Sequence, residues 1–206
     1  MHSARQAVGA QVVLSCLTVF GLWLTAAGAQ APAAVPVFKI VVGESKIKFD
    51  VEASVDIKGT FDKWEASLTF TSPAAESAVL DVKIQAASVN TGSGIKDSKL
   101  KSEDFFNVKE APLITFRSTK IVQTASETFD VQGTFTIRGV SKPETLHLTL
   151  SGKGTGAGEI TGTMAFDRKQ YGMNSGIPFI KIADRVEVSI NLKGRRVSGP
   201  PVVFKH

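Results

Sequence analysis

The sequence has 206 residues, with 24 Lys and Arg against 19 Asp and Glu, and carries a net charge of +5. The charges are scattered along the chain and form no basic block, so no nucleic-acid partner is expected. They indicate a solvated surface, with weak attraction to an anionic membrane as the functional alternative. The single cysteine, Cys16, lies in an apolar run near the N-terminus, so the rest of the chain has no disulfide framework and no thiol chemistry.

Residues 1–29 have the pattern of a secretory signal peptide. Arg5 precedes an apolar run over residues 12–24, and small residues at 27–29 suit signal peptidase. We expect cleavage after residue 29 or shortly beyond it. An uncleaved anchor is the alternative, although the run is short for a membrane span. Residues 30–36, rich in Ala and Pro, would then form a short tether.

From Val37 onward, apolar and polar residues alternate with a period of two, and clusters of Gly, Pro, Ser and Asn interrupt the alternation. This pattern predicts an antiparallel meander of about eight strands. Helical sequence is confined to residues 95–100 and a turn near 104–107. The apolar sets along the expected strands include Ile47, Phe49 and Val51, then Leu80, Val82 and Ile84, then Phe129, Val131, Phe135 and Ile137, then Met164 and Phe166.

The apolar phase changes parity between Phe61 and Trp64. A bulge or sharp bend at Asp62-Lys63 would return both series to one face of the sheet, as at the corner of a barrel.

With no helix layer to cover a sheet, the apolar faces of the strands must cover each other. A closed barrel and a two-sheet sandwich are the two solutions. Long strands with an almost wholly apolar inner face favour the barrel, which leaves room for one small ligand. The connection over residues 169–184 carries Met173, Ile177, Phe179 and Ile180, and serves either as an apolar rim or simply as cover for one end of the core.

Residues 100–118 contain two adjacent aromatic rings, Phe105 and Phe106, followed by a β-rich run after Pro112. Two neighbouring buried rings need an apolar wall or a cavity that both can reach. We expect a short helical plug over the open end of the barrel, with Ser102 capping its turn. A core-packing elbow between two strands is the alternative.

Few residues have the potential for catalysis. His147 alternates with apolar neighbours and is expected at the surface, so neither a zinc site nor a nucleophilic triad can be assembled. Arg168 continues the inward series of Met164 and Phe166. It could extend to the opening of the barrel, pair with Asp167 or Asp184, or hold the polar head of a ligand.

Four blocks of sequence resemble the YceI-like family of polyisoprenoid-binding proteins: Lys101-Ser102-x-Asp104-Phe105-Phe106-Asn107-Val108, Pro112-x-Ile114-Thr115-Phe116-x-Ser118, Gly133-x-Phe135-Thr136-Ile137-Arg138-Gly139-Val140-Ser141-Lys142-Pro143 and Phe166-Asp167-Arg168-x-x-Tyr171-Gly172-Met173. The resemblance covers the chain from about Val37 to Gly194. It implies an extended lipocalin-like antiparallel barrel around a long apolar ligand, in a protein exported to the bacterial periplasm. The chain departs from the family pattern at Gly43-Glu44-Ser45, which leaves the first hairpin open.

The resemblance implies that Phe105, Phe106, Phe116 and Phe135 lie near the ligand cavity and that Arg168 lies at its opening. With five further inward residues they form the predicted ligand-binding set: Phe49, Val51, Phe105, Phe106, Phe116, Phe135, Ile137, Met164, Phe166 and Arg168. The expected domain spans residues 37–194, followed by a tail over 195–206.

The predicted function is to bind a long-chain isoprenoid or related amphiphilic lipid, for carriage or sequestration in the periplasm, without enzymatic activity, cofactor or metal. Transient contact with a membrane surface is included, and a homodimer is left open. The rivals are an enzyme acting on such a lipid and a stress-related interaction module whose barrel is filled by its own side chains.

Overall fold

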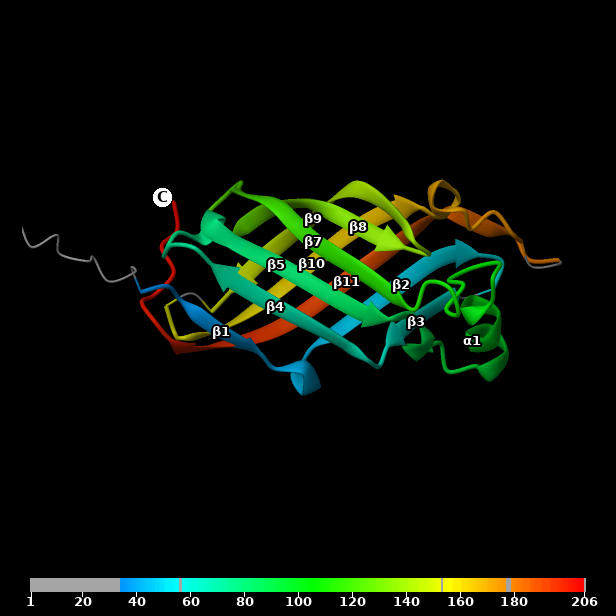
Figure 1. Cartoon of the computed structure of the whole chain (residues 1–206), viewed down its shortest axis with the longest axis horizontal. Helices are drawn as coiled ribbons and strands as arrows, with labels where there is room; N and C mark the ends of the chain where they lie inside the picture. Colours follow the sequence, from blue (N-terminus) through cyan, green and yellow to red (C-terminus); the bar gives the residue numbers. More distant parts are fainter. Residues whose placement is uncertain (1–33, 56, 153, 177–178, 206) are drawn as a thin grey trace, which may run out of the picture. The chain divides into compact units, whose positions relative to one another are not determined.

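The computed structural model describes residues 34–55, 57–152, 154–176 and 179–205, and one antiparallel sheet contains most of them (Figure 1). The expected signal peptide and the first part of the tether lie outside the described residues. The strands of the described chain are β1 (Val37–Ile40), β2 (Lys46–Ala53), β3 (Ile57–Phe61), β4 (Trp64–Phe70), β5 (Ala78–Gln85), β6 (Val89–Asn90), β7 (Leu113–Gln123), β8 (Thr128–Ile137), β9 (Val140–Ser151), β10 (Ala157–Asp167) and β11 (Ile182–Ser198). Its helical elements are α1 (Gly94–Lys101) and the short 3₁₀ segments η1 (Val42–Glu44), η2 (Ala75–Ser77), η3 (Ala86–Ser88) and η4 (Arg168–Tyr171).

Hydrogen bonds join the strands in the order β4-β5-β7-β8-β9-β10-β11-β2-β3-β6, and β1 pairs with β11. This single curled sheet confirms the predicted all-β, lipocalin-like barrel over a two-sheet sandwich. The strand count of about eight was too low, because the sheet has eleven strands. Two long stretches are each broken into two strands, and the short β1 adds a further one. The last strand also continues to Ser198 and so includes the first four residues of the expected tail, 195–198.

The break between β3 and β4 lies at Asp62-Lys63, where the sequence predicted a bend. The neighbouring chain is broken at the same level by η3, and the two breaks are joined by bonds from Asp62 N to Ser88 O at 3.0 Å and from Gln85 N to Lys63 O at 2.9 Å. Phe61 on one side of the break and Trp64 on the other both pack against the core. The predicted change of parity is therefore confirmed.

The barrel wall has a seam between β1 and β4. These two strands lie against each other, yet among the described residues no backbone ladder connects them. Instead the rings of Phe38 and Phe70 meet there, with centroids 5.8 Å apart. Side chains therefore close the wall where hydrogen bonds do not.

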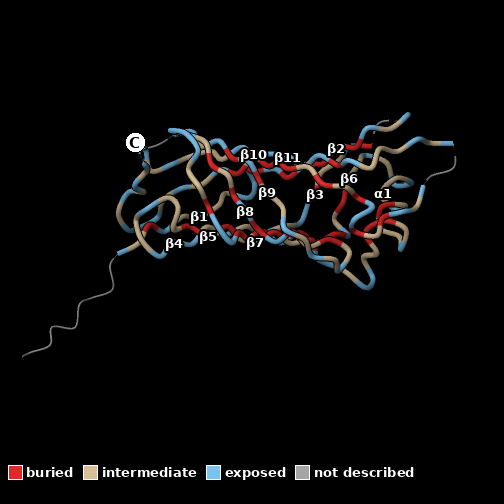
Figure 2. Tube along the Cα trace, turned by 90° about the horizontal axis from the view of Figure 1, so that it is seen from above, coloured by how far each residue is buried: buried red, intermediate tan, exposed pale blue. Residues whose placement is uncertain are grey.

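Buried residues run along the inside of the barrel and exposed residues alternate with them (Figure 2). In β2, for example, Ile47, Phe49 and Val51 are buried while Lys46, Lys48 and Asp50 are exposed, as the period-two pattern requires. Burial of this apolar face is the main favourable contribution to folding, at about 25 cal/mol per Å² removed from water.

The interior is tightly packed near the middle of the barrel, where large side chains lie over glycines. A Cβ added to Gly133 would stand 2.6 Å from the Phe116 ring and 2.6 Å from the Arg117 carbonyl oxygen. A Cβ at Gly162 would stand 2.3 Å from Leu148 Cδ2. Because these strands carry no side chain at the two glycines, Phe116 and Leu148 fill the space between the two ends of the barrel.

Helix α1 and the turn after it close one end of the barrel (Figure 1). The sequence predicted that Ser102 caps the start of a helical turn, but Ser102 instead follows the end of α1. There its Oγ donates to Lys99 O at 2.7 Å. The chain then turns through hydrogen bonds from Phe106 N to Leu100 O at 2.9 Å and from Asn107 N to Ser102 O at 2.8 Å. Over the described part of the chain, no helix is long and apolar enough to cross a bilayer.

Candidate ligand-binding site

The end of the barrel beneath α1 contains an apolar cavity of about 100 Å³, here called the helix-end cavity. Its wall comes from strands β2, β3, β5, β7, β8, β10 and β11, from α1 and from the turn that follows it. Charged side chains contribute to the lining at only three positions. The lining residues are Ile47, Phe49, Val51, Val55, Ile57, Phe61, Ile84, Lys96, Lys99, Leu100, Phe105, Phe106, Ile114, Phe135, Ile137, Phe166, Arg168, Met173, Ile180, Ile182, Val186 and Val188.

Two aromatic clusters contribute to this wall. Phe106 reaches down from the turn to Phe61, with ring centroids 5.9 Å apart, and to Phe49 at 6.5 Å in an edge-on arrangement. Phe166 and Phe135 lie 5.1 Å apart in the second cluster. Such tilted and edge-on contacts add to the stabilisation from area burial, so each cluster contributes to the stability of the cavity wall.

The second cluster is completed by Tyr171, which is fully buried and 5.2 Å from the Phe166 ring centroid. Its hydroxyl donates to Glu144 Oε1 at 2.8 Å. Burial, together with this hydrogen bond, raises the pKa of Tyr171 far above its ordinary value. The phenol therefore stays neutral and acts as a structural donor.

Arg168 is buried with only 6% of its surface exposed, and its guanidinium is bound on several sides. Nε donates to Ala183 O at 3.0 Å, and Nη1 donates to the carbonyls of Met173 and of Ser175, the latter at 3.0 Å. Nη2 pairs with Asp184 Oδ1 at 3.2 Å. Of the interpretations of Arg168, the structure therefore favours pairing, with Asp184 rather than Asp167 as the partner, and anchoring of the loop that follows η4.

Arg138 also holds this end of the barrel together, although its outward parity in the sequence pattern makes it a weak candidate for a site residue. It forms the tight β8–β9 turn with Gly139, at φ of 55° and 75° respectively, which is the two-residue hairpin geometry. From this turn Nη2 donates to Glu103 O at 2.7 Å, and Nη1 donates to Gly172 O. The Arg-Gly pair after a strand was the sequence signal for the turn, but no local pattern indicated these distant acceptors.

The turn after α1 is held by an ion pair between Lys99 and Asp104. Ser175 Oγ donates to the other oxygen of Asp104 at 2.8 Å, and Lys99 Nζ lies 5.8 Å from the centroid of the Phe105 ring. The hydrogen bonds from Lys99 and from Ser175 lower the pKa of the Asp104 carboxyl. Asp104 therefore joins this turn to the 173–175 loop across the opening of the helix-end cavity.

Eight of the ten predicted ligand-binding residues line the helix-end cavity. Phe116 and Met164 are buried but do not line it. The sequence missed Phe61 and Lys99, the first because the strand changes parity directly after it and the second because it lies on a helix. In the 169–184 connection, Met173 and Ile180 line the cavity and Phe179 is fully exposed, whereas Ile177 lies outside the described residues.

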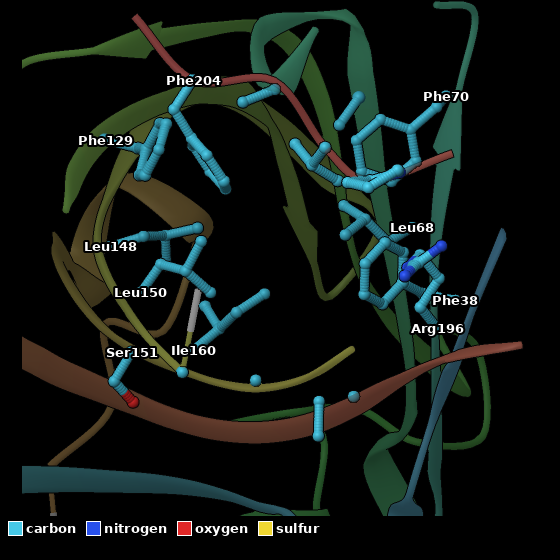
Figure 3. Close-up of a pocket in the computed structure, with 18 of the residues that line it drawn as sticks. Phe38, Leu68, Phe70, Phe129, Leu148, Leu150, Ser151, Ile160, Arg196 and Phe204 are labelled. Carbon is cyan, nitrogen blue, oxygen red and sulfur yellow. The ribbon is translucent and has the colours of Figure 1, made fainter. Parts of the chain in front are cut away.

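The opposite end of the barrel contains a second apolar cavity of about 160 Å³, here called the strap-end cavity. Figure 3 shows two groups of its side chains facing each other across an open space, with Phe129, Leu150 and Phe204 on one side and Phe38 and Phe70 on the other. The two cavities share no lining residue, and none of the ten predicted residues lines this one. The sequence analysis did not foresee a second cavity.

A curled antiparallel sheet around apolar cavities, closed at one end by a short helix, defines a lipocalin-like β-barrel. The profile of the YceI-like domain matches residues 38–194 of the chain. The chain therefore belongs to the YceI-like family, and the resemblance seen in its sequence is confirmed.

Relatives of known sequence include a UPF0312 protein of Pseudomonas savastanoi pv. phaseolicola, 34% identical over 98 residues, and a UPF0312 protein of Azotobacter vinelandii, 33% identical over 96 residues. The alignment to the Pseudomonas protein covers 48% of this chain and 51% of the relative, and the alignment to the Azotobacter protein covers 47% and 50%. The chain thus spans about half the length of these relatives.

Solved structures with the same fold include BcnA of Burkholderia cenocepacia, with a TM-score of 0.68 and 22% identity over 75% of this chain and 99% of that one. A YCEI protein of Campylobacter jejuni has a TM-score of 0.57 and 29% identity over 71% of this chain and 86% of its own. A polyisoprenoid binding domain from Saccharophagus degradans, implicated in plant cell wall breakdown, has a TM-score of 0.62 and 16% identity over 78% and 99%.

Proposed function

We propose that the barrel binds a long-chain isoprenoid or a related amphiphilic lipid through the helix-end cavity, and carries or sequesters it without chemical change. The observation that carries the proposal is the lining of this cavity, in which aliphatic and aromatic side chains predominate and the buried arginine is engaged by protein groups. The family, and a structural neighbour described as a polyisoprenoid binding domain, support the same ligand class.

The energetics suit an apolar chain. Each CH₂ group that leaves water contributes about 0.8 kcal/mol, so a prenyl chain binds tightly without polar contacts. The cavity of about 100 Å³ is smaller than the roughly 150 Å³ cavity that accepts a single benzene. A long chain therefore requires the wall to open, and the turn that carries Phe105 and Phe106 is one part of the wall that no β-ladder holds.

The rim of this cavity suits contact with a membrane. Ile95 is 85% exposed and Phe179 fully exposed, and each precedes a residue that lines the cavity, Lys96 and Ile180. Exposed apolar side chains beside lysines are typical of surfaces that insert shallowly among lipid head groups. We include such transient contact in the proposal, because a lipid would pass between bilayer and barrel without crossing water.

Binding to vesicles of phosphatidylethanolamine and phosphatidylglycerol tests this contact by sedimentation. The double variant Ile95→Asp, Phe179→Asp is expected to reduce the bound fraction, whereas Val42→Asp, at an exposed apolar position on η1, leaves it unchanged. Equal binding of all three proteins would remove membrane contact from the proposal.

The expected signal peptide supports a periplasmic location for this carrier. The test of location is the distribution of the full-length protein between periplasmic and cytoplasmic fractions, with and without residues 1–29. Retention in the cytoplasm by both forms would overturn the proposed location and leave the ligand proposal standing.

A filled-core interaction module is the second candidate, and the packed middle of the barrel favours it. Phe116 over Gly133 and Leu148 over Gly162 leave no continuous tunnel between the two cavities. Native mass spectrometry of protein isolated from its own cells separates the candidates. A bound species with a prenyl chain supports the carrier, while an apo protein that also refuses added geranylgeraniol supports the filled-core module.

A further inference from the structure

The strap-end cavity has a charged residue at an inward position of its wall. Along β11 the residues Leu192, Gly194 and Arg196 follow one another at intervals of two, and the last two line this cavity. Arg196 is half-buried and lies on the same side of the cavity as Phe38 (Figure 3), with which it pairs in the β1–β11 ladder. An arginine at such a position lays its apolar stem along the cavity wall and holds its charged head at the edge, where a polar group can reach it.

The guanidinium of Arg196 retains donors for such a group. Within the described part of the chain, the guanidinium makes one hydrogen bond, from Nη1 to Gly199 O at 2.6 Å. A guanidinium carries five N–H donors, so most of them are not used by this contact. Arg168, which lies on the inward series at the other end of the barrel, differs in this respect. Its donors are taken by backbone carbonyls and by Asp184, so it has little left for a ligand.

The strap-end cavity is capped by the C-terminal strap, residues 199–205. Lys205 N donates to Gln123 Oε1 at 2.7 Å, and Val203 is joined to the 73–75 loop by two backbone bonds, at 2.8 and 2.9 Å. Phe204 then lies over the cavity with its ring centroid 6.2 Å from that of Phe129. The strap follows the region matched by the family profile, which ends at residue 194, so this cap is built outside the matched region.

We propose that the strap-end cavity is a second, separate binding site that takes the alkyl chain of a fatty-acid-like carboxylate, with the carboxylate bound by Arg196. An apolar cavity of about 150 Å³ accepts benzene, so the volume of about 160 Å³ suits a chain of roughly six to eight carbons. Arg binds carboxylates through two parallel N–H donors, which suits a single head group at the edge of the cavity. The packed middle separates this site from the helix-end cavity.

Calorimetric titration of the protein with octanoate and with 1-octanol tests the head group. Arg196→Met keeps the length of the side chain but removes the charge. Because a hydrogen bond to a charged group is worth a factor of about ten or more, this variant is expected to weaken octanoate binding about tenfold and octanol binding less than twofold. An equal loss for both ligands, or no octanoate binding by the unaltered protein, overturns the proposal.

Filling each cavity in turn tests the location of the site. Ala78→Phe adds a ring inside the strap-end cavity and is expected to abolish octanoate binding, whereas Val51→Phe fills the helix-end cavity and leaves it unchanged. Ile160→Trp, at a half-buried lining position in the inward series of β10, replaces Ala78→Phe should that variant not fold, as judged by circular dichroism. Octanoate binding that is lost in Val51→Phe and kept in the other two overturns the proposal.

The same variants keep this proposal distinct from the proposed carrier function. Geranylgeraniol binding is expected to be lost in Val51→Phe and kept in Ala78→Phe, the reverse of the octanoate result. Loss of geranylgeraniol binding in the unaltered protein would overturn the carrier function alone, because octanoate would still bind at the strap end.

Discussion

Replacing Arg168 by Met tests whether this arginine anchors the barrel end or holds a ligand. The substitution keeps the apolar stem of the side chain and removes every donor of the guanidinium. Three backbone carbonyls, those of Met173, Ser175 and Ala183, then lose a charged donor. Asp184 loses one partner but keeps Lys169 at 2.8 Å, and with 43% of its side chain exposed it remains hydrated.

The magnitude follows from these contacts. A hydrogen bond to a charged group contributes about 1.5 to 3 kcal/mol, and removing one partner of a buried ion pair costs about 3 to 5 kcal/mol. Hydration of Asp184 and of the outer carbonyls offsets part of this loss. We therefore expect Arg168→Met to lower the free energy of unfolding by about 3 kcal/mol, a large share of the total stability of a domain of this size.

Urea denaturation measures this change, and Lys169→Met is the matched control. Lys169 pairs with the same carboxylate, but half of its side chain is exposed, so its removal is expected to cost less than about 1 kcal/mol. A similar cost for both variants would refute the anchoring role of Arg168. Unchanged stability combined with lost isoprenoid binding would assign the guanidinium to the ligand instead.

Three further outcomes are expected. Phe106→Asp weakens isoprenoid binding more than Lys83→Asp in a titration, because Phe106 lines the helix-end cavity and Lys83 lies on the outer face beside Glu65; equal effects would count against the cavity. Asp104→Asn flattens the loss of stability as pH falls below about pH 5, because the depressed pKa of Asp104 makes its contribution present above the unfolded-state pKa and lost as pH falls through the folded-state value. Parallel pH profiles for the two proteins would contradict this. Gly133→Ala destabilises the barrel by at least about 1 kcal/mol in urea, because the added Cβ meets a carbonyl oxygen at 2.6 Å that cannot move without its strand; no change would show that the middle of the barrel is loosely packed.

Local patterns in the sequence were sufficient for the strands and for the inner face of most of them. Period-two alternation places Phe49 and Val51 on the inner face regardless of which strands pair with theirs. The direction of a side chain is set by its own strand. The same reasoning located the bend at Asp62-Lys63, since two series of opposite parity can share one face only if the chain breaks between them. The strand count was too low because a change of parity indicates a bend but does not show whether the bend divides one strand into two.

Long-range contacts were beyond local patterns. The acceptors of Arg138 and Arg168 are backbone carbonyls, which every residue carries and which no residue type reveals. Phe116 and Met164 have the same inward parity as the residues that line the helix-end cavity, and only the tertiary structure places them outside its lining. The strap-end cavity depends on residues 199–205 crossing the barrel to reach Gln123 and Pro73.

The sequence by itself therefore determined the all-β class, the family and the inward face of the strands. Only the tertiary structure decided that the interior contains two cavities separated by a packed middle, and that Arg168 is engaged by protein groups whereas Arg196 is largely not. The physical reason is that alternation is encoded within one strand, whereas empty space depends on which side chains from distant strands meet at the same level of the barrel.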